Sequence, residues 1–364
     1  MADNQATQSI QSRTAAFCIT FGLEIPIMLA PMAGACPPAL SIAVAKAGGM
    51  GACGCLLMGP DAIQSWASEV RAATNGAFQL NLWIPDPTPT RDEAHEANIR
   101  TFLESWGPEV EAGAGDVTPP DFDAQCDAML AAGPSVISSI MGVYSADLVQ
   151  RMKDQGIKWI ATVTTVAEAR AAVEAGADAV VAQGMEAGGH RGAFDPDYAE
   201  RSMVGLFALV PAICDAVDVP VIATGGIADA RGVAAAMMLG ASAVQVGTGF
   251  LRSPQSDIAE VWRARLAETA PEDTAVTRAF SGRPGRALAT DYVRAANSSE
   301  TPDPAPYPIQ RGLTGPMRAD AATHNDIERM QAWAGQSAGL GDDIDANEKA
   351  QRLWTDAQNL MGLN

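Results

Sequence analysis

The chain contains the segment Val181-Ala182-Gln183-Gly184-Met185-Glu186-Ala187-Gly188-Gly189-His190-Arg191-Gly192, in which an apolar run is followed by a glycine-rich turn that holds a histidine. Residues 179–182 are apolar enough for a strand that helices cover on both faces, as in a parallel sheet. The glycines that follow let the backbone approach a ligand closely or adopt positive φ. The segment predicts an α/β fold with an active-site loop after this strand.

Short apolar runs alternate with alanine-rich, helix-periodic stretches through the first 250 residues. This alternation is the signature of repeated βα units, and eight such strands suffice to close a TIM (β/α)8 barrel. We expect strands at residues 26–33, 49–57, 79–84, 135–141, 159–164, 179–183, 219–224 and 243–248. We expect helices between them, at residues 37–47, 60–73, 146–155, 166–175 and 230–239.

The remaining segments do not follow this alternation of strands and helices. We assign residues 22–252 together with 270–300 to the barrel. Residues 85–133 are longer than an ordinary crossover and rich in Pro, Glu and Asp, so we expect them to cover a mouth of the barrel, with a helix near 94–106. Residues 301–364 are predicted to form a C-terminal helical extension on the active-site side.

Composition excludes several classes of function. The formal net charge of −19 argues against binding to nucleic acid or to an anionic membrane, which would require concentrated Lys and Arg. No apolar run reaches the length of a membrane span, and the N-terminus lacks the pattern of a secretory signal. Six scattered cysteines form neither a disulfide framework nor a zinc motif. We therefore expect free thiols, no metal site and a cytoplasmic protein that acts on a small molecule.

His190 is the candidate catalytic residue. Histidine is suited to proton transfer near neutral pH, and a partly open loop would keep its pKa near ~6.5. Glu186, four residues earlier, is a candidate to orient the ring, although a solvated carboxylate is the preferred interpretation. The alternative is that His190 only holds the turn by hydrogen bonds.

A phosphate-binding site is predicted after the last two barrel strands. Gly225 and Gly226 follow the seventh strand, and Gly247 and Gly249 follow the eighth, where barrels of this type often bind phosphate through backbone N–H groups. The alternative is that these glycines only shape tight turns. Met32, Asn81 and Gln183 are suited to contact a flat ring and its polar edge, but the residues alone do not separate a flavin from a sugar phosphate.

Several motifs resemble those of the FMN-dependent nitronate monooxygenases, formerly called 2-nitropropane dioxygenases, and of the related flavin-dependent enoyl-ACP reductases. The resemblance covers about residues 22–340 and is most specific in the His190 loop. Its pieces are Ala30-Pro31-Met32-Ala33-Gly34, residues 183–192, Thr224-Gly225-Gly226-Ile227, Gln245-Val246-Gly247-Thr248, Phe280-Ser281-Gly282-Arg283-Pro284, Pro306-Tyr307-Pro308 and Trp333-Ala334-Gly335-Gln336.

The resemblance implies an FMN oxidoreductase in which His190 lies over the flavin as base or substrate-orienting group. A nitronate and O2 would be converted to a carbonyl compound and nitrite. The residues implied to hold FMN are Ala30, Pro31, Met32, Asn81, Gln183, Gly188, Gly225, Gly226, Gln245, Gly247 and Thr248. A homodimer is left open.

Two positions depart from the family pattern. Leu29 stands where glutamine is usual, so one polar contact near the flavin is expected to be missing. Ile140 stands where the monooxygenases typically carry a second active-site histidine, and it can neither donate a hydrogen bond to a nitronate nor relay a proton. Arg191 favours the monooxygenase branch, because the enoyl reductases tend to have an apolar residue there.

Two alternatives to the monooxygenase hypothesis follow from these departures. The first is an NAD(P)H-dependent flavin reductase that acts on a quinone or an enoyl thioester. The second is a flavin-binding protein without catalytic activity, since a shared fold does not guarantee a shared function.

Overall fold

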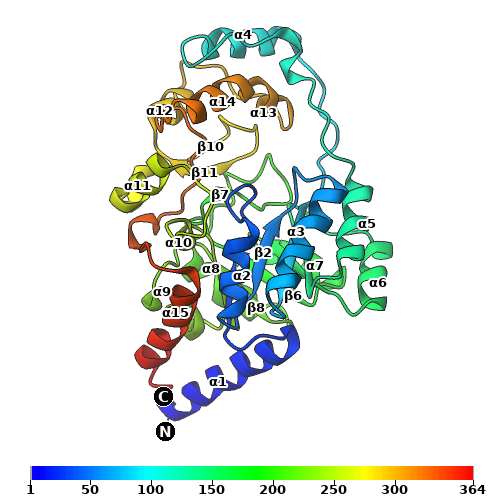
Figure 1. Ribbon diagram of the computed structural model, residues 1–364, viewed down its shortest axis with the longest axis vertical. Helices are drawn as coiled ribbons and strands as arrows, with labels where there is room; N and C mark the ends of the chain where they lie inside the picture. Colours follow the sequence, from blue (N-terminus) through cyan, green and yellow to red (C-terminus); the bar gives the residue numbers. More distant parts are fainter. Residues whose placement is uncertain (1, 364) are drawn as a thin grey trace.

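The computed structural model describes residues 2–363, which form a closed parallel β-barrel with further helices and a small sheet at one end (Figure 1). The barrel order is β1-β9-β8-β6-β5-β4-β3-β2, and a parallel bridge between Met28 and Met50 joins β2 back to β1. The strands are β1 (Ile27–Leu29), β2 (Gly51–Gly54), β3 (Phe78–Trp83), β4 (Val136–Ile140), β5 (Lys158–Val163), β6 (Ala179–Gln183), β8 (Val221–Thr224) and β9 (Ala243–Val246).

A layer of helices covers the outside of the barrel and buries the apolar strand faces. The helix that completes the ring after β9 is the last one in the chain, and it packs against α9, α2 and β1 rather than over the mouth. The ring consists of α2 (Pro38–Lys46), α3 (Pro60–Ala73), α5 (Phe122–Ala132), α6 (Ala146–Asp154), α7 (Val166–Glu174), α8 (Leu206–Cys214), α9 (Ala230–Met238) and α15 (Ala346–Met361).

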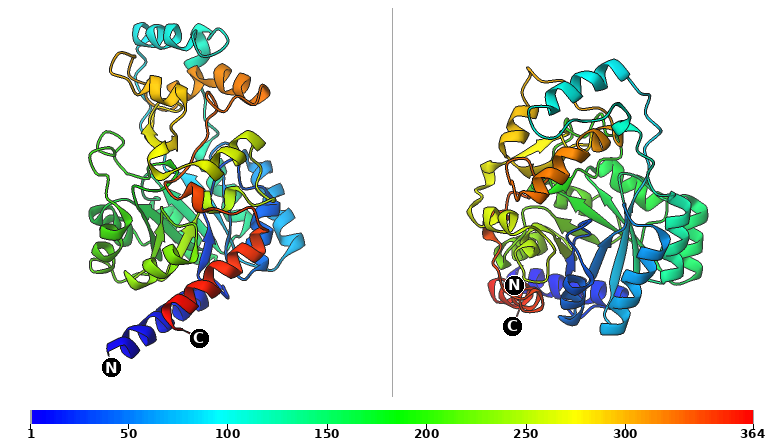
Figure 2. Two further views of the ribbon diagram at one scale, coloured as in Figure 1. Left: turned by 90° about the vertical axis from the view of Figure 1, so that its left-hand side faces the viewer. Right: turned by 45° about the horizontal axis from the view of Figure 1, so that its top comes forward.

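Helix α1 (Ala2–Phe21) closes the end of the barrel where the strands begin. Phe17 and Phe21 are almost fully buried and pack against the first residues of the strands, including Met28 and Val136. The end of α15 comes close to α1 (Figures 1 and 2), where Gln11 donates a hydrogen bond to the carbonyl of Leu363. Because α1 closes this end, a ligand can reach the barrel interior only from the end where the strands finish.

A group of elements that we call the mouth module lies at the carboxyl ends of the strands (Figures 1 and 2). Its antiparallel sheet has the order β10-β11-β7, and an apolar cluster around Phe280 and Tyr292 forms its own small core. The module consists of β7 (Gly189–His190), β10 (Thr274–Thr277), β11 (Gly285–Leu288), α4 (Glu93–Leu103), α12 (Asp291–Ala296), α13 (Ile309–Leu313), α14 (Gly315–Thr323) and the 3₁₀ turn η1 (Ala112–Gly115). Short elements connect it to the barrel: α10 (Thr248–Leu251), α11 (Glu260–Glu268), η2 (Pro271–Asp273) and η3 (Ala338–Leu340).

The structure confirms the predicted TIM barrel and all eight predicted strands. The strands are mostly shorter than predicted, because the apolar runs continue into the turns. Helix α1 was not anticipated, and residues 270–300, which we grouped with the barrel, contribute β10 and β11 to the mouth module. Residues 85–133 split between α4 of that module and α5 of the barrel wall. All six cysteines are unpaired, as predicted, and none of the described helices is long and apolar enough to cross a membrane.

Substitution of Leu353 tests whether α15 contributes to the core of the barrel wall. Its side chain is 5% exposed, whereas Leu360 on the same helix is 60% exposed. We expect Leu353→Ala to lower the free energy of unfolding by about 2–5 kcal/mol, because it leaves a cavity in the core. Leu360→Ala should change it by no more than about 0.5 kcal/mol. Urea unfolding measures both variants, and equal small effects would show that α15 does not contribute to the core.

Candidate functional site

A cavity of about 420 Å³ opens at the carboxyl ends of the barrel strands, under the mouth module. This volume lies in the range of small-ligand and cofactor pockets. His190 and all the residues proposed to hold the flavin line this one cavity, whereas Gly249 and Glu186 do not: the lining residues are Ala30, Pro31, Met32, Asn81, Gln183, Gly188, His190, Gly225, Gly226, Gln245, Gly247 and Thr248. Parallel strands bring these positions together because all their carboxyl ends meet at one edge.

Three amide side chains reach the cavity from three different strands. Asn81 Nδ2 donates to Ser138 Oγ at 3.0 Å, and Gln79 Nε2 donates to Gln245 Oε1 at 3.1 Å. Gln183 is used within its own loop: its Nε2 donates to the carbonyl of His190 at 3.0 Å, and its Oε1 accepts from Gly192 N at 2.8 Å. Gln183 therefore sets the position of the histidine loop, whatever contact it also makes with a ligand.

Glycines keep one side of the cavity free of side chains. A Cβ atom at Gly188 would clash with the backbone nitrogen of Gly335, which donates its hydrogen to Thr248 Oγ1 at 3.0 Å. Gly226 has a φ of 68°, a conformation that L-residues with a Cβ rarely adopt. The backbone after β6, β8 and β9 is thus exposed to a ligand at close range.

Aromatic rings and a serine hold His190 in place. Its backbone pairs with Gly285 of β11. Its ring centroid lies 4.6 Å from that of Trp83 and 4.7 Å from that of Trp333. Nε2 lies 2.7 Å from Ser281 Oγ, and the Ser281 hydroxyl is also placed to donate to the carbonyl of Arg283. Both contacts are satisfied if Nε2 carries the proton, which leaves Nδ1 as an acceptor.

The surroundings of His190 favour its neutral form, in contrast to our expectation that its pKa stays near 6.5. Burial, together with the positive charges of Arg283 and Arg311, lowers its pKa from 6.5 to about 3. The expectation assumed an open loop. In the structure two tryptophans contact the ring, and the sequence places neither of them near it.

Glu186 does not orient His190, and its carboxylate is bound by the protein rather than free in solvent. Both carboxylate oxygens of Glu186 accept from the backbone N–H of Leu206, at 2.9 and 3.1 Å, where α8 begins. The four-residue spacing would bring the two side chains together on a helix. Residues 189–190 instead form a strand.

Two buried arginines connect the histidine loop to its surroundings. Arg191 donates to the carbonyls of Gln183 and Ser202, at 2.6 and 3.2 Å. Arg283 forms an ion pair with Asp86, with Nε 2.7 Å from Oδ2. Arg191 therefore stabilises the loop through hydrogen bonds to its backbone and does not line the cavity.

The two departures from the family pattern have different structural consequences. Ile140 lines the cavity and makes that part of its wall apolar. Leu29 is fully buried among apolar side chains of the barrel and is not a lining residue, and its carbonyl accepts from Gln79 Nε2 at 3.0 Å. Only the Ile140 replacement changes the surface that a ligand meets.

Some aromatic and charged residues of the cavity come from the mouth module, from the segment after it and from the end of β3, and they were not among the predicted site residues. These are Trp83, Trp333 and Arg311, with Ser281 behind His190. Ser281 and Trp333 lie in the quoted motifs, which was the only signal for them. Their contact with His190 depends on how the module docks on the barrel.

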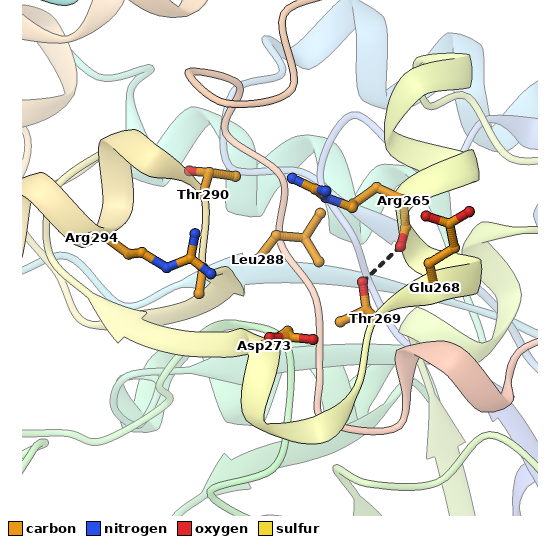
Figure 3. Close-up of a pocket in the computed structure, with 8 residues that line it drawn as sticks. Arg265, Glu268, Thr269, Asp273, Leu288, Thr290 and Arg294 are labelled. Carbon is orange, nitrogen blue, oxygen red and sulfur yellow. Dashed lines mark hydrogen bonds between the residues drawn. The ribbon is translucent and has the colours of Figure 1, made fainter.

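A second cavity, of about 220 Å³, lies between α11, β11 and α12 (Figure 3). Arg265 and Arg294 line it together with Glu268 and Asp273. Arg265 forms an ion pair with Glu328, and Arg294 lies 3.7 Å from Asp291. Because its positive charges already face carboxylates, this cavity is a weaker candidate for a ligand site than the barrel cavity.

Comparison with known proteins gives consistent matches over nearly the whole chain. A family model described as nitronate monooxygenase matches residues 16–353. A nitronate monooxygenase from Paraburkholderia phytofirmans is 37% identical over 338 residues, which cover 91% of this chain and 92% of that protein. A probable nitronate monooxygenase from Staphylococcus aureus is 35% identical over 342 residues, covering 93% and 96%.

Solved structures agree with these matches. A nitroalkane oxidase from Streptomyces ansochromogenes has a TM-score of 0.87 and 32% identity, covering 94% of this chain and 99% of that one. FabK from Thermotoga maritima has a TM-score of 0.74 and 31% identity, covering 95% and 96%.

The protonation state of His190 can be measured directly. With its pKa lowered to about 3, the ring should stay neutral from about pH 8 down to about pH 5. The unfolded chain binds this proton more tightly, so the shift also predicts that the folded state loses stability as the pH falls from 6.5 toward 3. NMR of ¹⁵N-histidine-labelled protein, assigned with His190→Asn, follows the ring. A titration midpoint near 6.5 would contradict the burial that we describe.

Proposed function

Because the chain belongs to the nitronate monooxygenase family, we propose that it oxidises alkyl nitronates with O2 to a carbonyl compound and nitrite. The protein is an oxidoreductase of the TIM-barrel type. The observation that carries the proposal is the gathering of His190, the amides and the glycines around one cavity. A cytoplasmic location and a homodimer remain predictions.

The family is flavin-dependent, and we propose that the flavin is FMN. The residues present suit this group: exposed backbone at Gly225, Gly226, Gly247 and Thr248 would hold a phosphate, and the amides of Asn81 and Gln245 would contact the polar edge of a ring. Ala30, Pro31, Met32, Gln183 and Gly188 complete the proposed set. A bound flavin supplies the electron transfer between substrate and O2.

The chain's own residues would enclose and orient the substrate. Trp83 and Trp333 both pack their rings against His190, which reduces the contact of its ring with water. His190 Nε2 is held by Ser281, so Nδ1, which has no hydrogen-bond partner among the described residues, is available to the substrate. Because its pKa is low, we propose that His190 orients the substrate rather than acting as a strong base.

A second candidate is an NAD(P)H-dependent flavin reductase. The apolar wall at Ile140 and the similarity to FabK favour it. The monooxygenase remains the first candidate, because the structural similarity to the nitroalkane oxidase is greater. Anaerobic mixing separates the two: rapid bleaching of the flavin by NADH would support the reductase, and bleaching by a nitronate alone would support the monooxygenase.

The cofactor proposal predicts that heat-treated protein releases FMN, identified by chromatography and mass spectrometry. Gly188→Ala should weaken flavin binding by about 10- to 100-fold, because its Cβ would push against the backbone of Gly335. Gly59→Ala is the matched control, since no atom lies within 4 Å of its Cβ position. Release of FAD, or unchanged binding in Gly188→Ala, would contradict the proposed site.

The activity proposal predicts nitrite release and O2 consumption with ethyl nitronate. His190→Asn should keep its flavin and lose about 10- to 100-fold in kcat/KM, the scale of a hydrogen bond to a charged group. His324→Asn, at a side chain that is 65% exposed and outside the cavity, serves as the control. If His190→Asn loses the flavin instead, the residue supports the cofactor loop and the assignment is wrong.

A further inference from the structure

Arg311 is the only cationic side chain among the described residues that line the barrel cavity. It lies on α13 of the mouth module, four residues after Tyr307, whose ring centroid is 5.2 Å from that of Trp83. Its charge is close enough to His190 to lower the pKa of that ring. Arg311 therefore belongs to the part of the cavity where His190 lies.

The guanidinium of Arg311 has no hydrogen bond or ion pair with any residue that the structure describes, although it is partly buried. The other arginines near the site are held by the protein. Arg283 pairs with Asp86, and Arg318 donates to Thr314 Oγ1 and to the carbonyl of Arg311. Among the described residues that line the cavity, Asp257 is the only one with a carboxylate, and it forms no ion pair with Arg311.

A partly desolvated cation without a counter-ion is unfavourable, and an anion bound beside it would relieve this cost. Burial lowers the pKa of Arg311, and among its neighbours only the Tyr307 phenol opposes this shift. The remaining wall near His190 cannot provide a positive charge, because the histidine is neutral and Ile140 is apolar. A negatively charged ligand in this part of the cavity would therefore be bound through Arg311.

We propose that Arg311 recognises the negative charge of the substrate, so that the enzyme takes the preformed nitronate anion and discriminates against the neutral nitroalkane. This inference rests on the proposed function. A nitronate presents two oxygens in one plane, which matches the planar donor fork of a guanidinium in the way that a carboxylate does. Recognition is by binding alone and requires no proton transfer by His190.

The decisive measurement compares two unreactive ligands of the same shape, butyrate and butyramide, which differ in charge. Calorimetric titration of the flavin-loaded enzyme should show that butyrate binds more tightly. In Arg311→Gln the Kd for butyrate should rise by about 10- to 100-fold, while that for butyramide changes little. Arg311→Lys, which keeps the charge, should restore most of the affinity. Equal losses for both ligands, or no loss for butyrate, would overturn the proposal.

Kinetics provide the second readout. Arg311→Gln should raise KM for ethyl nitronate more than it lowers kcat, and should reduce the preference for ethyl nitronate over freshly dissolved nitroethane. Arg294→Gln removes an arginine from the second cavity and should leave both substrates unaffected. Loss of flavin from Arg311→Gln would show that the residue serves the cofactor and would refute the proposal.

The two proposals can fail separately. If the wild-type enzyme releases no nitrite but butyrate still binds in an Arg311-dependent manner, the proposed reaction is wrong and the charge recognition stands. If nitronates are oxidised but the Arg311→Gln and wild-type enzymes bind butyrate equally, the reaction stands and the role of Arg311 is wrong.

Discussion

Closure of the parallel barrel is the constraint on which the rest of the structure depends. Strand β1 pairs with β9 on one side and bridges to β2 on the other, so all eight strands point the same way around a ring. Their carboxyl ends meet at one rim, which brings Asn81, Gln183 and Gln245 together from distant parts of the sequence. Helix α1 closes the opposite end with Phe17 and Phe21, so the rim becomes the place where a ligand can enter.

The barrel and the mouth module contribute different chemistry to the cavity. The barrel supplies exposed backbone and amides, which suit a cofactor with a phosphate and a polar ring edge. The module and the segment after it supply Ser281, Arg311 and Trp333. The ion pair between Arg283 and Asp86 links the two parts close to His190. Binding of the cofactor and recognition of the substrate can therefore be altered at different residues.

The electrostatics of the cavity follow from this division. Burial and the charges of Arg283 and Arg311 keep His190 neutral. Arg311, which lines the cavity, is therefore the side chain that can bind a negatively charged ligand there. Ile140 adds an apolar side chain to the cavity wall and offers no group that could bind an anion. A site of this kind favours a substrate that arrives already ionised.

The local pattern of the sequence determined the barrel and the cofactor side of the cavity. Apolar runs such as residues 179–183 mark strands buried on both faces, and glycines directly after them mark exposed backbone, so Gly188, Gly226 and Gly247 could be placed at the rim in advance. Only the tertiary structure decided three features: the neutral form of His190, the hydrogen bonds of the Glu186 carboxylate to the start of α8, and the position of Arg311 in the cavity. These depend on contacts between residues that a local pattern does not connect, from Glu186 with Leu206 to His190 with Ser281 and Trp333. Burial and the nearest charges set a pKa, and a local sequence pattern contains neither.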